Sequence, residues 1–134
     1  MPHAMNRRAF LSARHSDQPL LAAYGQLVAT ELALKDHHHS AGWPKGHDVP
    51  GLLGDLGDPG LTALGVQLRE ELSAIPCTDI SGNTATVRPN KYPELRYTQH
   101  ENDHTGGTTD ANLLNLVKVV EDIIVQLRAK GVAI

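Results

Sequence analysis

The feature that most constrains the fold is a long aliphatic stretch near the C-terminus, residues 109–129. Its apolar side chains recur every three or four residues, which places them on one face of an α-helix. They are Leu113, Leu116, Val120, Ile123 and Leu127. Further aliphatic residues widen this face until only a polar strip remains. A helix apolar over so much of its circumference must be covered by several neighbouring helices or by a second copy of the chain.

Three other segments are expected to supply that cover. Pro19 fits the first turn of a helix that should end near residues 36–38, and Asp48 with Pro50 opens a short second helix. Asp58 caps a third helix, which Pro76 ends. In the final helix, Thr109 is the expected N-cap. The sequence therefore predicts an all-α fold, an up-and-down bundle of four or five helices.

Two regions are expected to lie outside this bundle. Residues 1–16 are basic and lack an apolar continuation, so we expect a disordered N-terminal arm before a single bundle domain of residues 17–134. From about residue 77 to 108 the chain is rich in Thr, Asn, Asp, Gly and Pro, which predicts a long irregular loop. Residues 84–87 are its one β-capable piece. A loop of this length is usually functional or mobile, or it contains an element that the local pattern does not reveal.

Composition excludes several classes of function. A formal charge of −3 argues against broad electrostatic capture of nucleic acid, although it leaves room for a local basic patch. No apolar run reaches the roughly 20 residues that span a bilayer, so no membrane partner is expected. No glycine-rich phosphate loop is present, and no cofactor is expected. We expect a cytoplasmic protein.

Histidines are numerous, and a metal site is one interpretation of them. The ligands would come from His37, His39, His47, His100 and His104. A catalytic zinc site usually combines two close ligands on one element with a third elsewhere. Consecutive histidines at a helix end point in different directions, and the residues between His100 and His104 differ from those of the zinc motif. Exposed histidines in polar loops are therefore favoured over a metal site.

Arg96 and the histidines after it suggest a different chemistry. Metal-independent RNA cleavage needs an acid or base for the 2′-hydroxyl and the leaving oxygen, and a cation for the charge that develops at phosphorus. Arg96 with His100 or His104 would supply both, so these three are the candidate catalytic residues. In the alternative interpretation, Arg96 forms a structural ion pair with Glu31, Asp48 or Glu94.

Three short segments together resemble HEPN domains. They are residues 31–35 at the end of a first helix, 46–49 opening a second, and 93–97 before a polar loop and a long aliphatic helix. The resemblance covers roughly residues 18–130. It implies a helical bundle, usually dimeric through its helices, that serves either as an RNase toxin or antiviral effector or as a noncatalytic relative beside a nucleotidyltransferase.

Some single residues of this chain match the motifs of HEPN domains, and one spacing differs from them. Arg96 and Tyr97 match the Arg-Tyr feature, and His47 with Asp48 matches the His-Asp feature, where a capping role is as well supported as a functional one. Glu31 and Lys35, an i, i+4 pair, are expected to support the site. Neither interval from Arg96, three residues to His100 or seven to His104, matches the ribonuclease members.

The expected function is a HEPN-like protein of a bacterial or phage conflict system, either toxin–antitoxin or defence. It would act on RNA or beside a nucleotidyltransferase, as a metal-independent ribonuclease or without catalysis. We expect a homodimer or hetero-oligomer through the last helix, with an antitoxin or a nucleotidyltransferase as partner. The alternatives are a histidine-based metal-dependent enzyme and a structural interaction module.

Overall fold

The computed structural model describes residues 4–38, 46–78, 81–98 and 107–134. The fold is all-α, a helical bundle as predicted, with one very small sheet. Its helices are α1 (Ala4–Leu11), α2 (Pro19–His37), α3 (Val49–Gly54), α4 (Pro59–Ser73) and α5 (Asp110–Ala129), with the 3-10 helices η1 (Ser12–His15) and η3 (Tyr92–Tyr97). The strands are β1 (Pro76–Thr78) and β2 (Thr84–Thr86).

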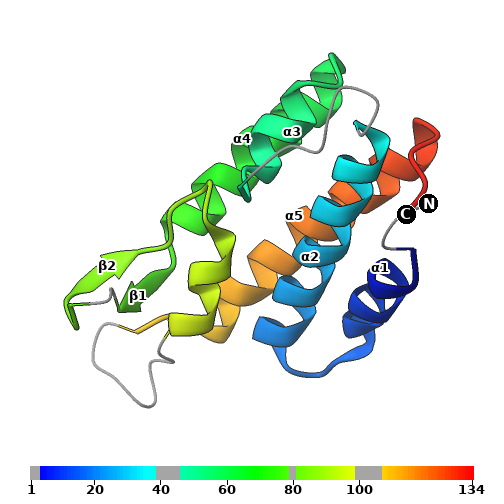
Figure 1. Ribbon diagram of the computed structural model, residues 1–134. Helices are drawn as coiled ribbons and strands as arrows, with labels where there is room; N and C mark the ends of the chain where they lie inside the picture. Colours follow the sequence, from blue (N-terminus) through cyan, green and yellow to red (C-terminus); the bar gives the residue numbers. More distant parts are fainter. Residues whose placement is uncertain (1–3, 39–45, 79–80, 99–106) are drawn as a thin grey trace.

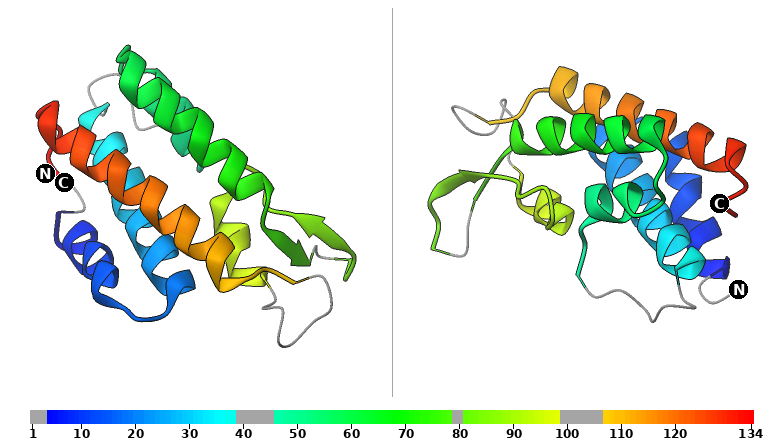
Figure 2. Two further views of the ribbon diagram at one scale, coloured as in Figure 1. Left: turned by 180° about the vertical axis from the view of Figure 1, so that it is seen from behind. Right: turned by 90° about the horizontal axis from the view of Figure 1, so that it is seen from above.

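The bundle is organised around α5. Helix α5 packs against α2 on one side and α4 on the other, while α1 lies on α2, and α3 lies on α4 and α2 (Figure 2). The successive long elements α1, α2, α4 and α5 alternate in direction (Figure 1). The five α5 residues predicted to face inward, Leu113 to Leu127, are all at most 4% exposed. That prediction is confirmed.

The caps predicted for α3, α4 and α5 are also present. The Thr109 hydroxyl accepts a hydrogen bond from the Asn112 N–H at 3.1 Å, and Asp48 accepts one from the Gly51 N–H at 3.1 Å. Asp58 accepts from the Leu61 N–H at 2.9 Å and pairs with Lys130 at 3.0 Å. The backbone hydrogen bond and then the Lys130 ammonium lower the pKa of Asp58 below its ordinary value. These side chains satisfy N–H groups that the first helical turn leaves without carbonyl partners.

The prediction of a disordered N-terminal arm is wrong for the described part of that segment. Residues 4–11 form α1, which packs along α2. The Arg7 guanidinium donates to the Asp36 carboxylate at 2.6 Å, and both side chains are almost fully buried. Leu11 joins the hydrophobic core. Because the partner carboxylate is 29 residues away, the local sequence pattern could not reveal that Arg7 is an anchor.

The long irregular loop predicted for residues 77–108 contains short regular elements in its described part, between turns and irregular backbone. Strands β1 and β2 pair antiparallel with Cys77 opposite Ala85, so the β-capable piece is confirmed at Thr84–Thr86. The Val87 N–H then donates to the Ile75 carbonyl at 2.9 Å. Tyr92 and Leu95 bury their side chains and fix η3 on the bundle. Residues 79–80 and 99–106 lie outside the described residues.

The bundle covers only the inner side of α5. Leu114 and Val125 lie on the outer side and are 55% and 60% exposed. The last helix is therefore apolar toward its neighbours and mixed in character on the surface, rather than enclosed on every side. None of the helices in the described ranges is long and apolar enough to cross a bilayer.

Candidate functional site

A buried carboxylate on α2 is the centre of the candidate site. Glu31 is 5% exposed. One of its oxygens accepts a hydrogen bond from the Tyr92 hydroxyl at 2.5 Å, and the other accepts from His47 Nδ1 at 2.8 Å. The Lys35 ammonium lies 3.2 Å from the same oxygen as His47. A buried charge is costly unless it is paired and hydrogen-bonded, and here both conditions are met.

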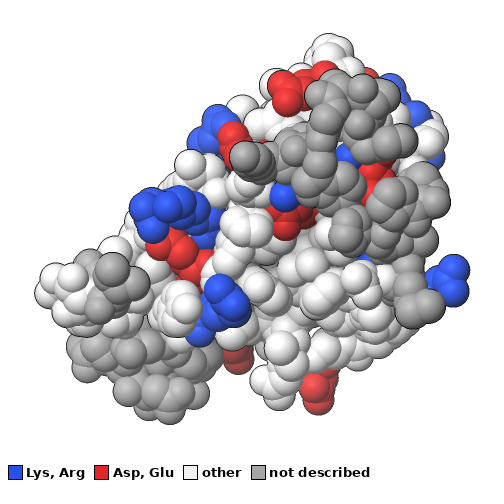
Figure 3. Space-filling view, in the orientation of Figure 1, with Lys and Arg blue, Asp and Glu red and all other residues white. Residues whose placement is uncertain are grey.

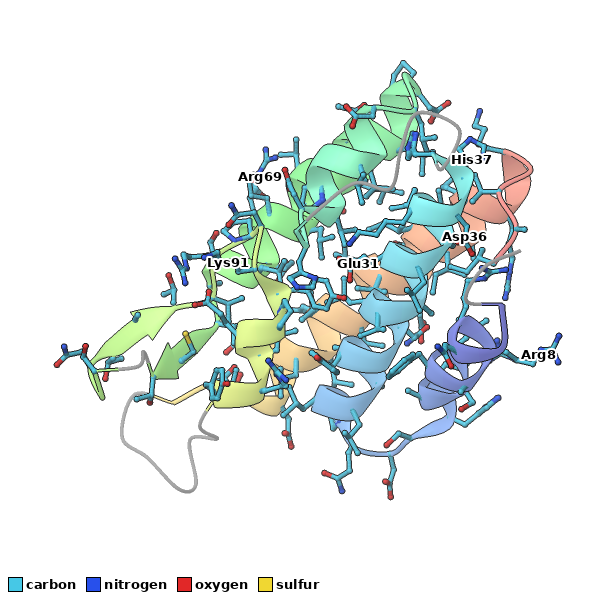
Figure 4. The ribbon with its side chains drawn as sticks, viewed as in Figure 1. Arg8, Glu31, Asp36, His37, Arg69 and Lys91 are labelled. Atoms are coloured by element: carbon cyan, nitrogen blue, oxygen red, sulfur yellow. The ribbon has the colours of Figure 1, made fainter. Side chains whose placement is uncertain are left out.

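Two side chains of α2 hold the segment that carries His47. Lys35, one helical turn beyond Glu31, donates to the Gly46 carbonyl at 2.7 Å. Glu31 holds the His47 ring, and the His47 backbone forms a bridge with Lys91 at the start of η3. Figure 4 shows Glu31 on the side of α2 that faces η3, with Lys91 across from it. Three segments far apart in the sequence therefore converge here.

Tyr92 supplies the buried wall of the site. Burial raises the pKa of its phenol, and the hydrogen bond to Glu31 raises this pKa further. The phenol therefore stays neutral and donates. The Tyr92 ring lies between two others, with ring centroids 5.9 Å from Tyr24 and 5.7 Å from His47. The His47 ring is consequently held by a hydrogen bond at one edge and by an aromatic contact on another side.

His47 is the group in this cluster that solvent can reach. Its side chain is 48% exposed, against 7% for the Glu31 side chain. A carboxylate only accepts hydrogen bonds, so Nδ1 carries the hydrogen in this contact and Nε2 of the neutral ring is the acceptor. Among the described residues, Nε2 has no hydrogen-bond partner. An imidazole held in this tautomer by a carboxylate is suited to accept a proton from a substrate.

His47 lines an open hollow of about 300 Å³. Lys91, Pro93, Glu94, Arg96 and Tyr97, all at η3 or its N-terminus, form most of the rest of its wall. Glu94 is held by Arg88 at 2.9 Å, and these hydrogen bonds lower the pKa of the Glu94 carboxyl. Figure 3 shows blue basic side chains with red carboxylates between them on this face, over η3. Arg88 thus compensates most of the charge of Glu94 and Lys91 contributes through its charge, while neither Lys91 nor Arg96 has a carboxylate within ion-pair distance among the described residues.

The ion pair considered for Arg96 is not formed with any of the three carboxylates named for it. Glu94 is taken by Arg88, Asp48 caps α3, and Glu31 is taken by His47, Tyr92 and Lys35. Arg96 instead donates from Nε to the Pro93 carbonyl at 3.1 Å. Its guanidinium carbon lies 5.7 Å from the centroid of the Tyr97 ring. Arg96 is exposed at the wall of the hollow.

Of the three predicted catalytic residues, the structure describes Arg96 alone. Arg96 lines the hollow, while His100 and His104 fall outside the described residues. The histidine that shares the hollow with Arg96 is His47, which the sequence suggested as a supporting or capping residue. The capping role belongs to its neighbour Asp48.

Of the histidines proposed as metal ligands, only His37 and His47 lie in the described ranges, and they line two separate hollows. His37 lies at the C-terminal end of α2, beside a separate hollow that Asp58 and Lys130 also line. Its ring meets His38 edge-on, with centroids 5.5 Å apart. His39, His100 and His104 are outside the described residues. Within the described part of the chain, no group of three His, Cys, Asp or Glu side chains could hold a metal ion.

Sequence reasoning missed Tyr92, the residue that completes the Glu31 cluster. Tyr92 and Glu31 are separated by 61 residues, and no local pattern links a tyrosine before a proline to a distant helix. Composition offered one weak signal. The chain has three tyrosines, so each tyrosine near a predicted helix end is a candidate partner for a buried carboxylate.

Comparison of the chain with protein-family models, curated proteins and solved structures finds no match in any of the three.

Proposed function

We propose that this chain is a HEPN-like protein of a bacterial or phage conflict system that cleaves RNA without a metal ion. The hollow beside η3 would be its active site, with His47 as the proton acceptor and Arg96 and Lys91 as the phosphate-binding cations. RNA as substrate implies a cytoplasmic location. The resemblance to HEPN domains supports the RNA class, because His47 and Arg96 lie in two of the three segments that carry it.

One observation carries this proposal. The His47 ring is held through Nδ1 by a buried carboxylate at 2.8 Å, yet it stays half exposed at a hollow that Arg96 also lines. A fixed base and a guanidinium that has no carboxylate partner in the described part of the chain are the two groups that 2′-hydroxyl attack on phosphorus requires. A histidine kept only for packing would not need both the carboxylate and the exposure.

The chemistry would proceed by transfer within the RNA. His47 Nε2 takes the proton of a 2′-hydroxyl, and the 2′ oxygen forms a bond to the adjacent phosphorus. The bond from phosphorus to the 5′ oxygen breaks, and that oxygen takes up a proton from water. The products are a 2′,3′-cyclic phosphate and a 5′-hydroxyl. Arg96 and Lys91 stabilise the negative charge that develops on the phosphate oxygens.

A cleavage assay on single-stranded RNA tests the proposal. The wild-type chain should cleave in the presence of EDTA, and His47→Ala should lower the rate by roughly 10²- to 10⁴-fold, the usual contribution of a general base. His15→Ala, which removes an exposed histidine on η1, serves as the matched control and should cleave at the wild-type rate. Loss of cleavage in EDTA, or equal rates for His47→Ala and His15→Ala, would contradict the proposal.

A noncatalytic role through a partner is the second candidate, and the outer face of α5 favours it. Leu114 and Val125 are more than half exposed there, and Lys118 and Glu121 lie between them on the same side of the helix. Two copies of this face, placed antiparallel about a two-fold axis, bring Leu114 opposite Val125 and Lys118 opposite Glu121. Self-complementarity of this kind is what an isologous dimer needs. A homodimer is therefore the partner arrangement we propose first, ahead of an antitoxin or a nucleotidyltransferase.

A further inference from the structure

The wall of the hollow carries an aromatic ring that is exposed to solvent and does not pack in the hydrophobic core. Tyr97, the last residue of η3, is 55% exposed, whereas Tyr92 of the same element is 2% exposed and belongs to the core. Burying an aromatic side chain is a large part of what it contributes to stability. Tyr97 forgoes much of this contribution, and its ring lines the hollow instead.

Positive charge accompanies this ring. The Arg96 guanidinium carbon stands 5.7 Å from the centroid of the Tyr97 ring, and Lys91 lines the same hollow. Neither cation has a carboxylate partner within ion-pair distance among the described residues. An exposed aromatic ring beside two cations is a combination that binds single-stranded nucleic acid, since bases stack on the ring and phosphates meet the charges.

The size and form of the hollow limit which ligands can bind in it. A volume of about 300 Å³ is at the lower end of small-molecule sites, so it accommodates one nucleotide unit. Bases within a duplex are already stacked and paired, and their faces cannot reach a side chain. We propose that the hollow holds an unpaired nucleotide of single-stranded RNA, with its base on Tyr97 and its phosphate at Arg96 and Lys91. The inference rests on the proposed function for the choice of RNA.

Binding of an uncleavable probe tests this inference separately from catalysis. The probe is a fluorescein-labelled 2′-O-methyl oligouridylate of about ten nucleotides, a length that covers one binding site, followed by fluorescence anisotropy with the full chain. Tyr97→Ala should weaken binding by roughly tenfold or more, the usual cost of losing one stacking platform. Tyr97→Phe keeps the ring and should bind within about twofold of wild type.

Two controls make the result specific. Phe10→Ala removes another exposed aromatic side chain, on α1, and should leave binding unchanged. The same oligonucleotide annealed to its complement should bind much more weakly than the single strand. A polyglutamate peptide that displaces the RNA from wild type and from Tyr97→Ala equally would show that the hollow recognises charge alone, and would overturn the inference.

The remaining outcomes separate this inference from the proposed function. Binding that depends on Tyr97, together with no cleavage of unmodified RNA, supports the nucleotide site and contradicts the ribonuclease. Cleavage that depends on His47, with equal binding by Tyr97→Ala and Phe10→Ala, supports the ribonuclease and overturns the stacking site. Absence of any binding by the wild-type chain overturns the inference as well.

Discussion

Glu31 illustrates how one residue can link the core of this bundle to its surface. Its carboxylate is buried, and it meets a phenol from η3, an imidazole from the segment before α3 and an ammonium from its own helix. Each partner removes part of the cost of burying the charge. The same contacts fix the orientation of His47, so stability and the proposed chemistry depend on a single side chain.

At this scale we expect Tyr92→Phe to destabilise the protein. The substitution keeps the ring and removes the hydroxyl that donates to Glu31 at 2.5 Å, leaving a buried charge with one hydrogen bond fewer. Hydrogen bonds to charged groups contribute about 1.5–3 kcal/mol, so the free energy of unfolding in urea should fall by that amount. Tyr97→Phe, which alters an exposed tyrosine, should change it by less than about 0.5 kcal/mol. An equal change in the free energy of unfolding for the two variants would contradict the central role of Glu31.

At the scale of elements, α2 and the segment of α1 and η1 approach each other closely at Gly25. A Cβ built on Gly25 would overlap the Ala13 side chain and lie 2.9 Å from the Phe10 carbonyl oxygen. The absence of a side chain at Gly25 therefore lets α1 and η1 lie directly on α2. Arg7 and Asp36 then fix the other end of this contact.

We accordingly expect Gly25→Ala to displace α1 and η1 from α2. Overpacking of this kind costs roughly 1–3 kcal/mol, which should appear as a lower melting temperature and as faster hydrogen exchange in residues 4–15. Gly54→Ala is the matched control, because a Cβ at that helical position meets nothing within 4 Å. The two variants could instead have the same melting temperature, with hydrogen exchange in residues 4–15 as slow in Gly25→Ala as in the wild type. In that case the N-terminal segment does not pack on α2 as described.

The elements also show what the sequence can and cannot predict here. The helices α2 to α5, the side-chain caps of α3, α4 and α5 and the inner face of α5 follow from local spacing, and all of these were predictable. Helix α1 and η3 were not, because each is fixed by a partner far along the chain: Arg7 by Asp36, and Tyr92 by Glu31. Arg96 and His47 were both singled out from the sequence, but only the folded chain brings them to one hollow.

At the scale of the whole molecule, the outer face of α5 is the contact that we propose between two copies of the chain. In the proposed antiparallel dimer, Lys118 of each copy meets Glu121 of the other. Lys118→Glu places like charges opposite each other and should convert the dimer to a monomer. The double variant Lys118→Glu with Glu121→Lys restores opposite charges and should restore the dimer. Light scattering after size-exclusion chromatography measures both masses.

The charge exchange also has outcomes that would exclude this dimer. A wild-type chain that elutes as a monomer contradicts it directly. A Lys118→Glu variant that stays dimeric would place the interface elsewhere on the molecule. Both variants alter exposed positions, so neither should lower the melting temperature of the isolated subunit by more than a few degrees.

The most direct measurement concerns the central claim, cleavage at a 2′-hydroxyl by His47. The substrate is a single-stranded DNA oligonucleotide with one ribonucleotide, incubated in EDTA with the wild-type chain or His47→Ala, and the product masses are determined by mass spectrometry. We expect a single cut on the 3′ side of the ribonucleotide, a 2′,3′-cyclic phosphate on the upstream fragment, and no such product from His47→Ala. An intact substrate, cuts at the deoxyribonucleotides, or the same products from His47→Ala would contradict the claim.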